Sequence, residues 1–494
     1  MAQSASNEHK WIWLLCLLAG VHVFIFSATF PFFNVMDEQV HFDLAVRYSH
    51  GGIPRTMAAP CDEVLPYIAI YGTSEYLWTP ESQPGGRFAP PPWTLPMAEA
   101  APKLLKEEAS WKNGVINYEV SQPPLYYALA GLWWDLGKAL GFHEGHLLYW
   151  LRFLNIFLVA ALAWLGWFTA RMVFPENLFL RLGVPALIAF LPQTTFYSVQ
   201  NDTLSPLCFG AAFILLLKWL QADVPNIRLG IAAGLALAAT YLAKISNAPL
   251  LAASAAIVLW QIWRWKKAGK LRASFPALAS LFFCAALPIA AWLAWCKYNF
   301  GDLTGTAAKV QFLGWTHKSF AEWWSHPIFT PHGLWTFISG LLATFWQGEM
   351  MWHRLPLALP SVDLIYAILS VGLIAVALVP RFKNADGPQC RALWFGFFAL
   401  AAAAAFLGFL SVIYDFQDCF YPSRAHPYFT SGRLMLGALI PFMLLFVYGL
   451  DRVLNRFGSP AKFLALGAMI LFMLISEIIT DWRIFPNPYN WFHL

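Results

Sequence analysis

The sequence predicts an all-α membrane protein that crosses the bilayer about eleven times and carries two large loops on one side. Of its 494 residues, 59% are hydrophobic and only 12% are charged, whereas about a quarter of the residues in a soluble chain are charged. The apolar runs are long enough to span, because about 20 residues cross a hydrocarbon core of about 30 Å. Clear examples are residues 11–33, 180–199 and 273–295. The net charge of +5 belongs mostly to short loops and does not indicate nucleic-acid binding.

Short basic loops set the predicted orientation. Lys and Arg accumulate in the cytoplasmic loops of membrane proteins. The basic loops are 171–181, 218–228, 264–272, 381–391 and 452–462. The segments that alternate with them, and that we expect outside, are 34–146, 200–203, 244–247, 297–360 and 414–432. The N-terminus is therefore expected in the cytoplasm, and the first apolar run, which lacks a small-residue cleavage site, is expected to stay as an anchor.

This alternation defines the crossings. We expect them near 11–33, 147–170, 180–199, 203–220, 228–244, 247–265, 273–296, 361–380, 391–413, 433–450 and 461–480. The apolar pieces 123–140 and 334–346 do not fit, so we expect re-entrant or surface-lying segments. If both span, the number of helices rises to thirteen and the positive-inside pattern fails in several loops. We therefore prefer eleven crossings. With eleven, the chain divides into a seven-helix module over 1–297, a second outer loop over 298–360 and C-terminal helices over 361–494.

The first outer loop has local structure of its own. Apolar residues recur at helical spacing between 36 and 48, which predicts an amphipathic helix lying on the membrane. Residues 51–96 are rich in Pro and Gly and are expected to be irregular, and 102–111 is a second short amphipathic segment. Cys61 and Cys419 fall in outer loops, where a disulfide is permitted, although the sequence does not show that they meet.

Acidic residues at the outer membrane face are candidates for chemistry. Asp37 and Glu38 directly follow the first crossing, at a depth where ionisable groups usually serve function. The alternative is that they cap the next helix. Asp202 occupies a tight outer turn and has the same two interpretations. His41 lies one helical turn after Asp37, either in the site or on a solvated face.

Arg433 is the basic candidate. It stands at the outer start of a long apolar helix, after a loop that contains His426. An arginine there can extend to lipid headgroups, but a planar guanidinium is also suited to hold a phosphate, and we favour the phosphate role. Gln122 precedes paired prolines, which have a plain structural use in fixing the entry of the next segment.

Several of these motifs carry a family resemblance. Asp37-Glu38, Gln122-Pro-Pro-Leu-Tyr-Tyr127, Arg152-Phe-Leu-Asn-Ile-Phe and Asn201-Asp202, in this order, resemble the N-terminal half of the glycosyltransferase C superfamily. Thr344-Phe-Trp-Gln-Gly348 and Ser431-Gly-Arg-Leu434 are most similar to a bacterial polytopic membrane family of unknown function. The pattern departs from the superfamily at Leu434, where Tyr is usual, and at the additional Gln347.

The resemblance implies sugar transfer from a polyprenyl-phosphate donor to a glycan, lipid or protein acceptor. The reaction would take place on the periplasmic or extracellular face of the plasma (inner) membrane. The residues that match the family's motifs then receive roles as follows: Asp37 as general base with Glu38 beside it, Arg433, Lys244 and His426 at the donor phosphate, and His41, Asp202, Gln122 and Tyr126 in support. Some members of the superfamily use a divalent cation, for which Asp37 and Asp202 would be the ligands, but two carboxylates do not establish such a site. The alternatives are a transporter or flippase of a lipid-linked or anionic substrate, and a non-catalytic scaffold.

Overall fold

Helices dominate the computed structural model, which describes residues 2–35, 37–379, 387–419 and 421–494. Within these residues, nine helical segments are long and apolar enough to cross a membrane: Glu8–Thr29, Glu144–Val173, Asn201–Gln221, Ile245–Lys267, Leu271–Phe300, Pro360–Leu378, Pro388–Ile413, Gly432–Arg456 and Ser459–Asp481. Two shorter apolar helices, Leu178–Ala189 and Ile227–Ala243, occupy the remaining predicted positions. The predicted all-α polytopic fold is confirmed.

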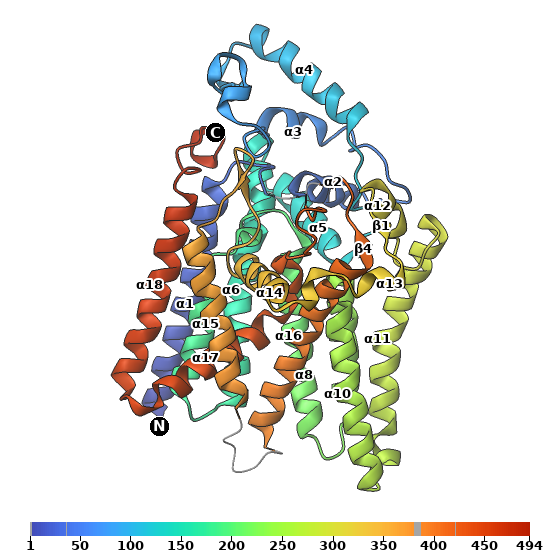
Figure 1. The fold of residues 1–494 in the computed structure, drawn as a ribbon, viewed down its shortest axis with the longest axis vertical. Helices are drawn as coiled ribbons and strands as arrows, with labels where there is room; N and C mark the ends of the chain where they lie inside the picture. Colours follow the sequence, from blue (N-terminus) through green and yellow to red (C-terminus); the bar gives the residue numbers. More distant parts are fainter. Residues whose placement is uncertain (1, 36, 380–386, 420) are drawn as a thin grey trace.

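The helices that correspond to predicted crossings form the body of the molecule (Figure 1). They are α1 (Ala2–Thr29), α6 (Glu144–Val173), α7 (Leu178–Ala189), α8 (Ser205–Gln221), α9 (Ile227–Ala243), α10 (Ala248–Lys267), α11 (Leu271–Phe300), α15 (Pro360–Leu378), α16 (Pro388–Ile413), α17 (Leu439–Val453) and α18 (Ser459–Asp481). Helix α17 is buried along most of its length.

Shorter elements gather at one end of this body. They are α2 (Glu38–Ser49), α3 (Leu65–Tyr71), α4 (Met97–Gly114), α5 (Leu125–Ala139), α12 (Ala307–Phe312), α13 (Phe320–Trp323) and α14 (Pro331–Gln347). Strand β1 (Thr316–His317) pairs antiparallel with β4 (Tyr414–Asp415), and β2 (Met351–Trp352) pairs with β3 (Leu355–Pro356). In Figure 1, α2 to α5 and the C-terminus lie at the upper end, whereas the N-terminus and the α10–α11 turn lie at the lower end. The predicted outer and basic loops therefore separate in space.

We expect cysteine labelling from outside to reach positions near Gly85 and Lys309 and to miss positions near Lys267. Short basic loops remain in the cytoplasm, and Lys267 ends the basic last turn of α10. Single cysteines in a cysteine-free background would be tested with a membrane-impermeant maleimide. Labelling near Lys267 from outside would overturn the orientation. The matching expectation for an inside position at Asp386, in the basic loop 381–391, concerns a residue outside the described part of the chain.

The predicted crossing over 180–199 is broken in the structure. Helix α7 ends at Ala189, and Pro192, which lacks an N–H, follows in a stretch with an irregular path. This stretch is buried, and irregular backbone at membrane depth is tolerated where protein covers it. Asn155 of α6 supplies hydrogen bonds of 3.1 and 2.7 Å to the carbonyls of Phe196 and Ser198. The first crossing also ends earlier than expected, because α1 stops at Thr29.

The first outer loop contains the predicted helix as α2, but the protein covers this helix, and its position on the membrane surface stays a prediction. Most of its residues are buried, because α5 packs directly against it. Gly131 of α5 permits this approach, since a Cβ there would lie 2.7 Å from the backbone nitrogen of Ser49. Segment 102–111 belongs to the longer α4, and part of 51–96 forms α3. Cys61 and Cys419 are free thiols.

Segments 123–140 and 334–346 form the helices α5 and α14. Helix α14 is seen nearly end-on in Figure 1, crosswise to the long helices beside it. Its C-terminal part carries the Thr344–Gly348 motif toward the start of the helical segment that contains Arg433. Gly432 makes this contact possible, because a Cβ on it would lie 2.2 Å from the backbone nitrogen of Phe345.

Candidate functional site

One arginine gathers the outer acidic residues. The guanidinium of Arg433 lies 3.0 Å from Asp37, 3.1 Å from Glu349 and 3.5 Å from Asp202. Lys244 forms a further ion pair with Asp202. We call Asp37, Asp202, Lys244, Glu349 and Arg433 the central cluster. It joins the start of α2, the turn before α8, the end of α9, the end of α14 and the segment before α17, so predicted residues far apart in the sequence meet.

Asp37 does not act as a helix cap. It stands at the N-cap position of α2, yet its side chain forms no capping hydrogen bond with the described residues of that helix. Its Oδ1 instead accepts a hydrogen bond of 2.5 Å from the Tyr118 hydroxyl, and its Oδ2 accepts one from Arg433. Its backbone is left-handed, with φ of 65°, a conformation that non-glycine residues keep mainly where the surroundings impose it. The capping alternative therefore fails for Asp37.

The charge of Asp37 is stabilised by its neighbours. Burial alone would raise the pKa of the Asp37 carboxyl, but Arg433 opposes burial and the pKa is lowered overall. Burial raises the pKa of Glu349, in spite of the same arginine. Burial also raises the pKa of Tyr118, which favours the neutral hydroxyl that donates to Asp37. At neutral pH Asp37 is thus an ionised acceptor of protons and hydrogen bonds.

Asp202 and Lys244 form the deepest part of the cluster. Both side chains are almost completely buried. The N-cap residue of α8 is Leu204, so the capping alternative for Asp202 fails as well. Burying a charge pair is costly unless further polar contacts accompany it, and Asp202 also faces Arg433.

A second ion pair lies beside the central cluster. Glu119 pairs with Lys309 and accepts a 2.7 Å hydrogen bond from Gln122, and Gln122 in turn accepts one of 3.3 Å from Asn201. Burial would raise the pKa of Glu119, but Lys309 and His41 lower it to about 2. The predicted supporting residue Gln122 therefore links this pair to the turn that carries Asp202.

His41 is buried in the site and does not lie on a solvated face. It is 1% exposed. Its Nδ1 lies 2.7 Å from the Tyr127 hydroxyl, and the two rings stack with centroids 5.9 Å apart. Burial lowers the pKa of His41 to about 4, so the ring is neutral at pH 7.

We expect His41→Gln to reduce the loss of stability on acidification. The pKa of His41 is about 4 in the folded protein and about 6.5 in an unfolded chain. Between these values the unfolded state binds a proton that the folded state excludes, so the free energy of unfolding decreases as the pH falls. Thermal unfolding of wild type and variant at about pH 7 and about pH 5 measures the effect. An equal decrease in both proteins would contradict it.

Glu38 occupies a different environment from Asp37. It is fully buried against Arg152 of α6, whose guanidinium nitrogens lie 3.0 and 2.7 Å from the two carboxylate oxygens. These oxygens also accept hydrogen bonds of 2.9 Å from the backbone N–H groups of Phe33 and Val199. Both carboxylate oxygens are thus engaged twice. This geometry differs from the catalytic role predicted for Glu38 and fits a positioning role, because it ties the end of α1 and the segment before Asp202 to α6.

Neither of the two remaining predicted residues, Tyr126 and His426, contacts Arg433 in the described part of the chain. Tyr126 is buried on α5 and faces the backbone of Gln200. His426 lies on an exposed loop, where its ring contacts Tyr428 at 5.1 Å. The predicted role of His426 at the donor phosphate stays a prediction.

Four residues of the site, Tyr118, Glu119, Lys309 and Glu349, were not predicted from the sequence. Two of these had a signal available. Glu119 stands three residues before the Gln122-Pro-Pro motif, and Glu349 directly follows the Thr344–Gly348 motif. An acidic residue next to a recognised motif was thus the clue, whereas nothing local marked Tyr118 or Lys309.

Comparison with known proteins matches a family described as a predicted membrane protein, DUF2142, over residues 21–415. The chain belongs to this family. No curated protein matches it significantly. The matched region of this DUF2142 protein contains Asp37, Asp202, Lys244 and Glu349, whereas Arg433 lies beyond it.

The carboxylates of the central cluster of this DUF2142 protein face cationic side chains. Among the described residues, no group of three or more His, Cys, Asp and Glu side chains is arranged to hold a metal ion. Asp37 and Asp202, the predicted ligands of a divalent cation, both face Arg433 instead. In the central cluster, the guanidinium of Arg433 compensates the negative charges that a divalent cation would otherwise compensate.

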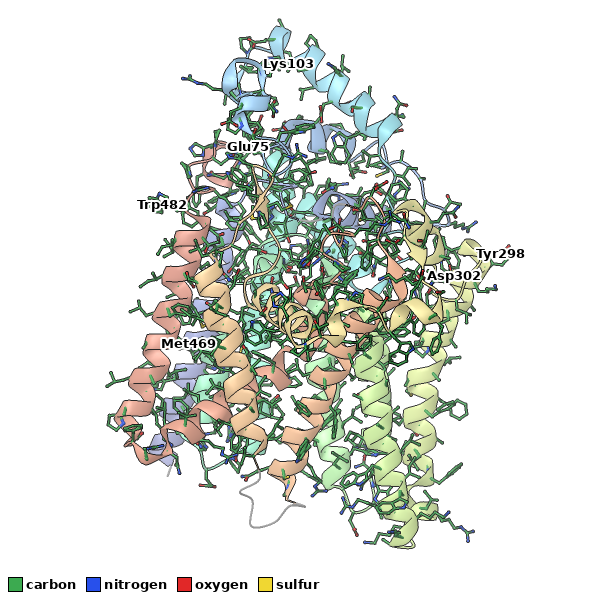
Figure 2. The ribbon with its side chains drawn as sticks, in the orientation of Figure 1. Glu75, Lys103, Tyr298, Asp302, Met469 and Trp482 are labelled. Carbon is green, nitrogen blue, oxygen red and sulfur yellow. The ribbon has the colours of Figure 1, made fainter. Side chains whose placement is uncertain are left out.

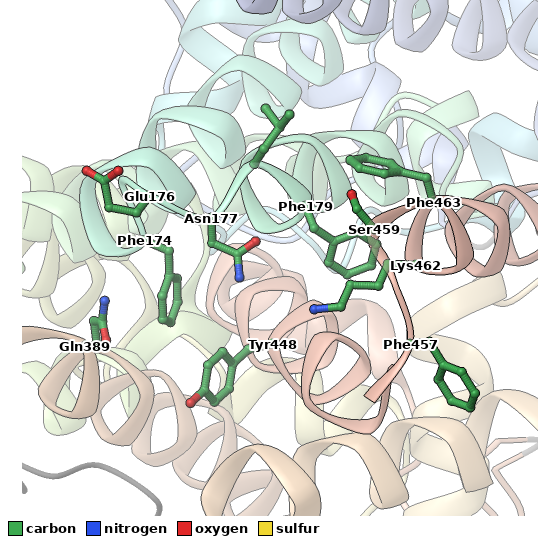
Figure 3. A pocket seen from close by; sticks show the side chains of 11 residues that line it. Phe174, Glu176, Asn177, Phe179, Gln389, Tyr448, Phe457, Ser459, Lys462 and Phe463 are labelled. Carbon is green, nitrogen blue, oxygen red and sulfur yellow. The ribbon is translucent and has the colours of Figure 1, made fainter. Parts of the chain in front are cut away.

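A separate polar cavity lies at the other end of α17. Its volume is about 490 Å³. Figure 3 shows the side chains that line it, which include Asn177, Tyr448 and Lys462. Lys462 and Asn177 both bind Asp451, at 2.7 and 2.9 Å. These contacts join the ends of α7, α17 and α18, so the cavity is distinct from the central cluster at the start of the α17 segment.

Proposed function

We propose that this DUF2142 protein transfers a sugar from a polyprenyl-phosphate donor to an acceptor hydroxyl, with Asp37 as general base. The observation that carries this proposal is the exposure of the three carboxylates around Arg433. The Asp37 side chain is 14% exposed, compared with 8% for Glu349 and 1% for Asp202. Asp37 is also ionised and free of a capping role. It is therefore the carboxylate of the cluster that an incoming hydroxyl reaches first.

In the proposed step, the acceptor hydroxyl gives its proton to Asp37 as its oxygen bonds to the anomeric carbon. The bond from that carbon to the phosphate oxygen breaks, and the lipid phosphate leaves with the electron pair. Arg433 and Lys244 stabilise the negative charge that grows on the phosphate. A phosphate that shares Arg433 weakens the influence of this arginine on Asp37, which raises the pKa of Asp37 and makes it a better base.

We expect Arg433→Ala to weaken donor binding more than Arg433→Lys does. Lysine keeps the charge but loses the planar fork that binds two oxygens at once. The loss for Ala should be about 1.5–3 kcal/mol, the usual contribution of a charged hydrogen bond. Dissociation constants for a labelled polyprenyl-phosphate sugar measure the difference. Arg354→Ala, at an exposed outer position, is the control and should bind as wild type does. Equal constants for wild type and both Arg433 variants would remove this residue from the donor site.

The transfer activity itself is tested with a panel of donors. Purified protein would be incubated with polyprenyl-phosphate hexoses and pentoses and a mixture of glycan and lipid acceptors, and loss of each donor would be followed. We expect one donor to be consumed only when an acceptor is present. Failure of every donor would count against the proposal.

A second candidate function is transport of a lipid-linked or anionic substrate. The observation that favours it is a set of buried polar side chains inside the predicted membrane region, where ionisable residues usually serve function. His22 of α1 lies 2.7 Å from Glu477 of α18, and the Tyr197 hydroxyl donates to the same carboxylate. The broken segment after α7 provides Tyr197, and discontinuous helices are typical of transporters.

The two candidates differ in what happens to the donor. Proteoliposomes loaded with a fluorescent lipid-linked sugar would show movement between leaflets without chemical change if the protein transports. The transferase predicts consumption of the donor, and it predicts that Glu477→Gln retains transfer. Translocation of an intact donor that Glu477→Gln abolishes would favour transport instead.

A further inference from the structure

A polar cavity lies on the same outer face as the central cluster. It has a volume of about 470 Å³, which is within the range of small-molecule sites. Its walls come from β1, from α13 and the turn Pro327–Phe329, from β4, and from the loop that follows β4. We call it the outer pocket and define it by His317, Lys318, Glu322, Tyr414, Asp415 and Arg424.

The charges of the outer pocket balance. Two cations, Lys318 and Arg424, face the pocket together with two carboxylates, Glu322 and Asp415. This composition does not favour a strongly anionic or strongly cationic ligand. It offers hydrogen-bond donors and acceptors side by side, which suits a ligand whose groups both donate and accept, as hydroxyls do.

The polar groups of the pocket are held in place before any ligand binds. Arg424 contacts both oxygens of Asp415, with a shortest distance of 2.8 Å, and donates to Gln417 at 2.6 Å. Gln417 donates to Thr316 of β1 at 2.8 Å. These contacts link the loop after β4 to the β1–β4 pair. Such preorganisation reduces the entropy lost on binding.

Aromatic rings lie next to these polar groups. His317 and Tyr414 are partners in the β1–β4 register, and their ring centroids are 4.6 Å apart. A ring presents an apolar face with a polar edge. A sugar has the complementary form, with an apolar face of C–H groups and a rim of hydroxyls.

Two aromatic contacts link the outer pocket to the proposed base. Trp315, directly before β1, packs against Tyr414 with centroids 5.6 Å apart. Phe312 of the preceding helix stacks on Tyr118, also at 5.6 Å, and the Tyr118 hydroxyl donates to Asp37. One short segment of the second outer loop therefore contacts both sites.

We propose that the outer pocket binds an uncharged saccharide unit of the acceptor and so presents the acceptor to Asp37. The word acceptor rests on the proposed function, whereas saccharide binding at this pocket does not. The ligand of the outer pocket is then a neutral sugar, bound at a site separate from the donor phosphate.

The test is direct binding of neutral tetrasaccharides to the full-length protein in lipid nanodiscs. Cellotetraose, maltotetraose and mannotetraose would serve as probes in saturation-transfer NMR, and inorganic phosphate would be added as a competitor to test the anionic alternative. We expect at least one tetrasaccharide to give a signal that Tyr414→Ala and Arg424→Ala each reduce at least fivefold. Lys103→Ala, on α4 at the far upper end in Figure 2, is the control and should leave the signal unchanged.

The conservative variant Tyr414→Phe separates loss of the ring from loss of the fold. It keeps the stacking surface and should retain the signal. Absence of a signal from all three tetrasaccharides, signals that survive both alanine variants, or binding of phosphate at this pocket instead would each overturn the inference. Saccharide binding without any donor consumption would defeat the proposed transferase and leave this site assignment intact.

Discussion

Asp37→Asn is expected to lower the rate of sugar transfer by roughly 10²- to 10⁴-fold, the usual contribution of general acid–base catalysis. Asparagine keeps the shape of the side chain and still accepts a hydrogen bond from Tyr118, but it cannot take a proton. Arg433 retains Glu349 and Asp202 as partners, so its charge stays compensated. Donor binding and the yield of folded protein should therefore remain near those of wild type.

Asp62→Asn is the matched control for this experiment. Asp62 also lies in the first outer loop and pairs with Lys112, but its side chain is 81% exposed. We expect the control to transfer at the wild-type rate. A fall in melting temperature that accounts for the lost activity of Asp37→Asn would assign Asp37 a structural role instead.

Glu38→Ala is expected to destabilise the folded protein by about 3–5 kcal/mol, because removal of one partner leaves the other charge buried and uncompensated. Among the described residues, the remaining Arg152 would keep the carbonyl acceptors at Ser27, Phe30 and Pro31. The guanidinium also lies 3.8 Å from the centroid of the Phe32 ring and has little room for a counter-ion. Thermal unfolding of the purified variant, or its failure to accumulate as folded protein, measures the effect.

The control for Glu38→Ala is Glu99→Ala on the exposed helix α4. Glu99 also pairs with a basic residue, Lys103, but both side chains are more than half exposed, and such surface pairs contribute about 0–1 kcal/mol. If Glu38→Ala unfolds at the wild-type temperature and loses transfer, the catalytic role first predicted for Glu38 would replace the positioning role.

The membrane architecture could be predicted from the sequence, because the length of each hydrophobic run and the charge of each loop are local signals. The positions of the crossings depend on little else. The break after Ala189 could not be predicted, because the run from 180 to 199 stays apolar and its irregular backbone is stabilised by residues such as Asn155 of α6. The burial of α2 depends in the same way on α5, which follows more than 70 residues later.

The candidate site was predictable in part for a similar reason. Asp37, Asp202 and Arg433 stand out as ionisable residues at the ends of apolar runs, and each was singled out. Their meeting, and the presence of Glu349 between them, depends on how α14 docks against the segment before α17. Only the fold contains that information.

The most direct test of the proposed transferase is the acceptor-dependent release of polyprenyl phosphate, with wild type and Asp37→Asn both saturated with the donor that the panel identifies. The account predicts that wild type releases one polyprenyl phosphate for each sugar transferred. Asp37→Asn should bind the donor equally well but release polyprenyl phosphate at least about a hundredfold more slowly. Release by Asp37→Asn at the wild-type rate would contradict the assignment of Asp37 as the base.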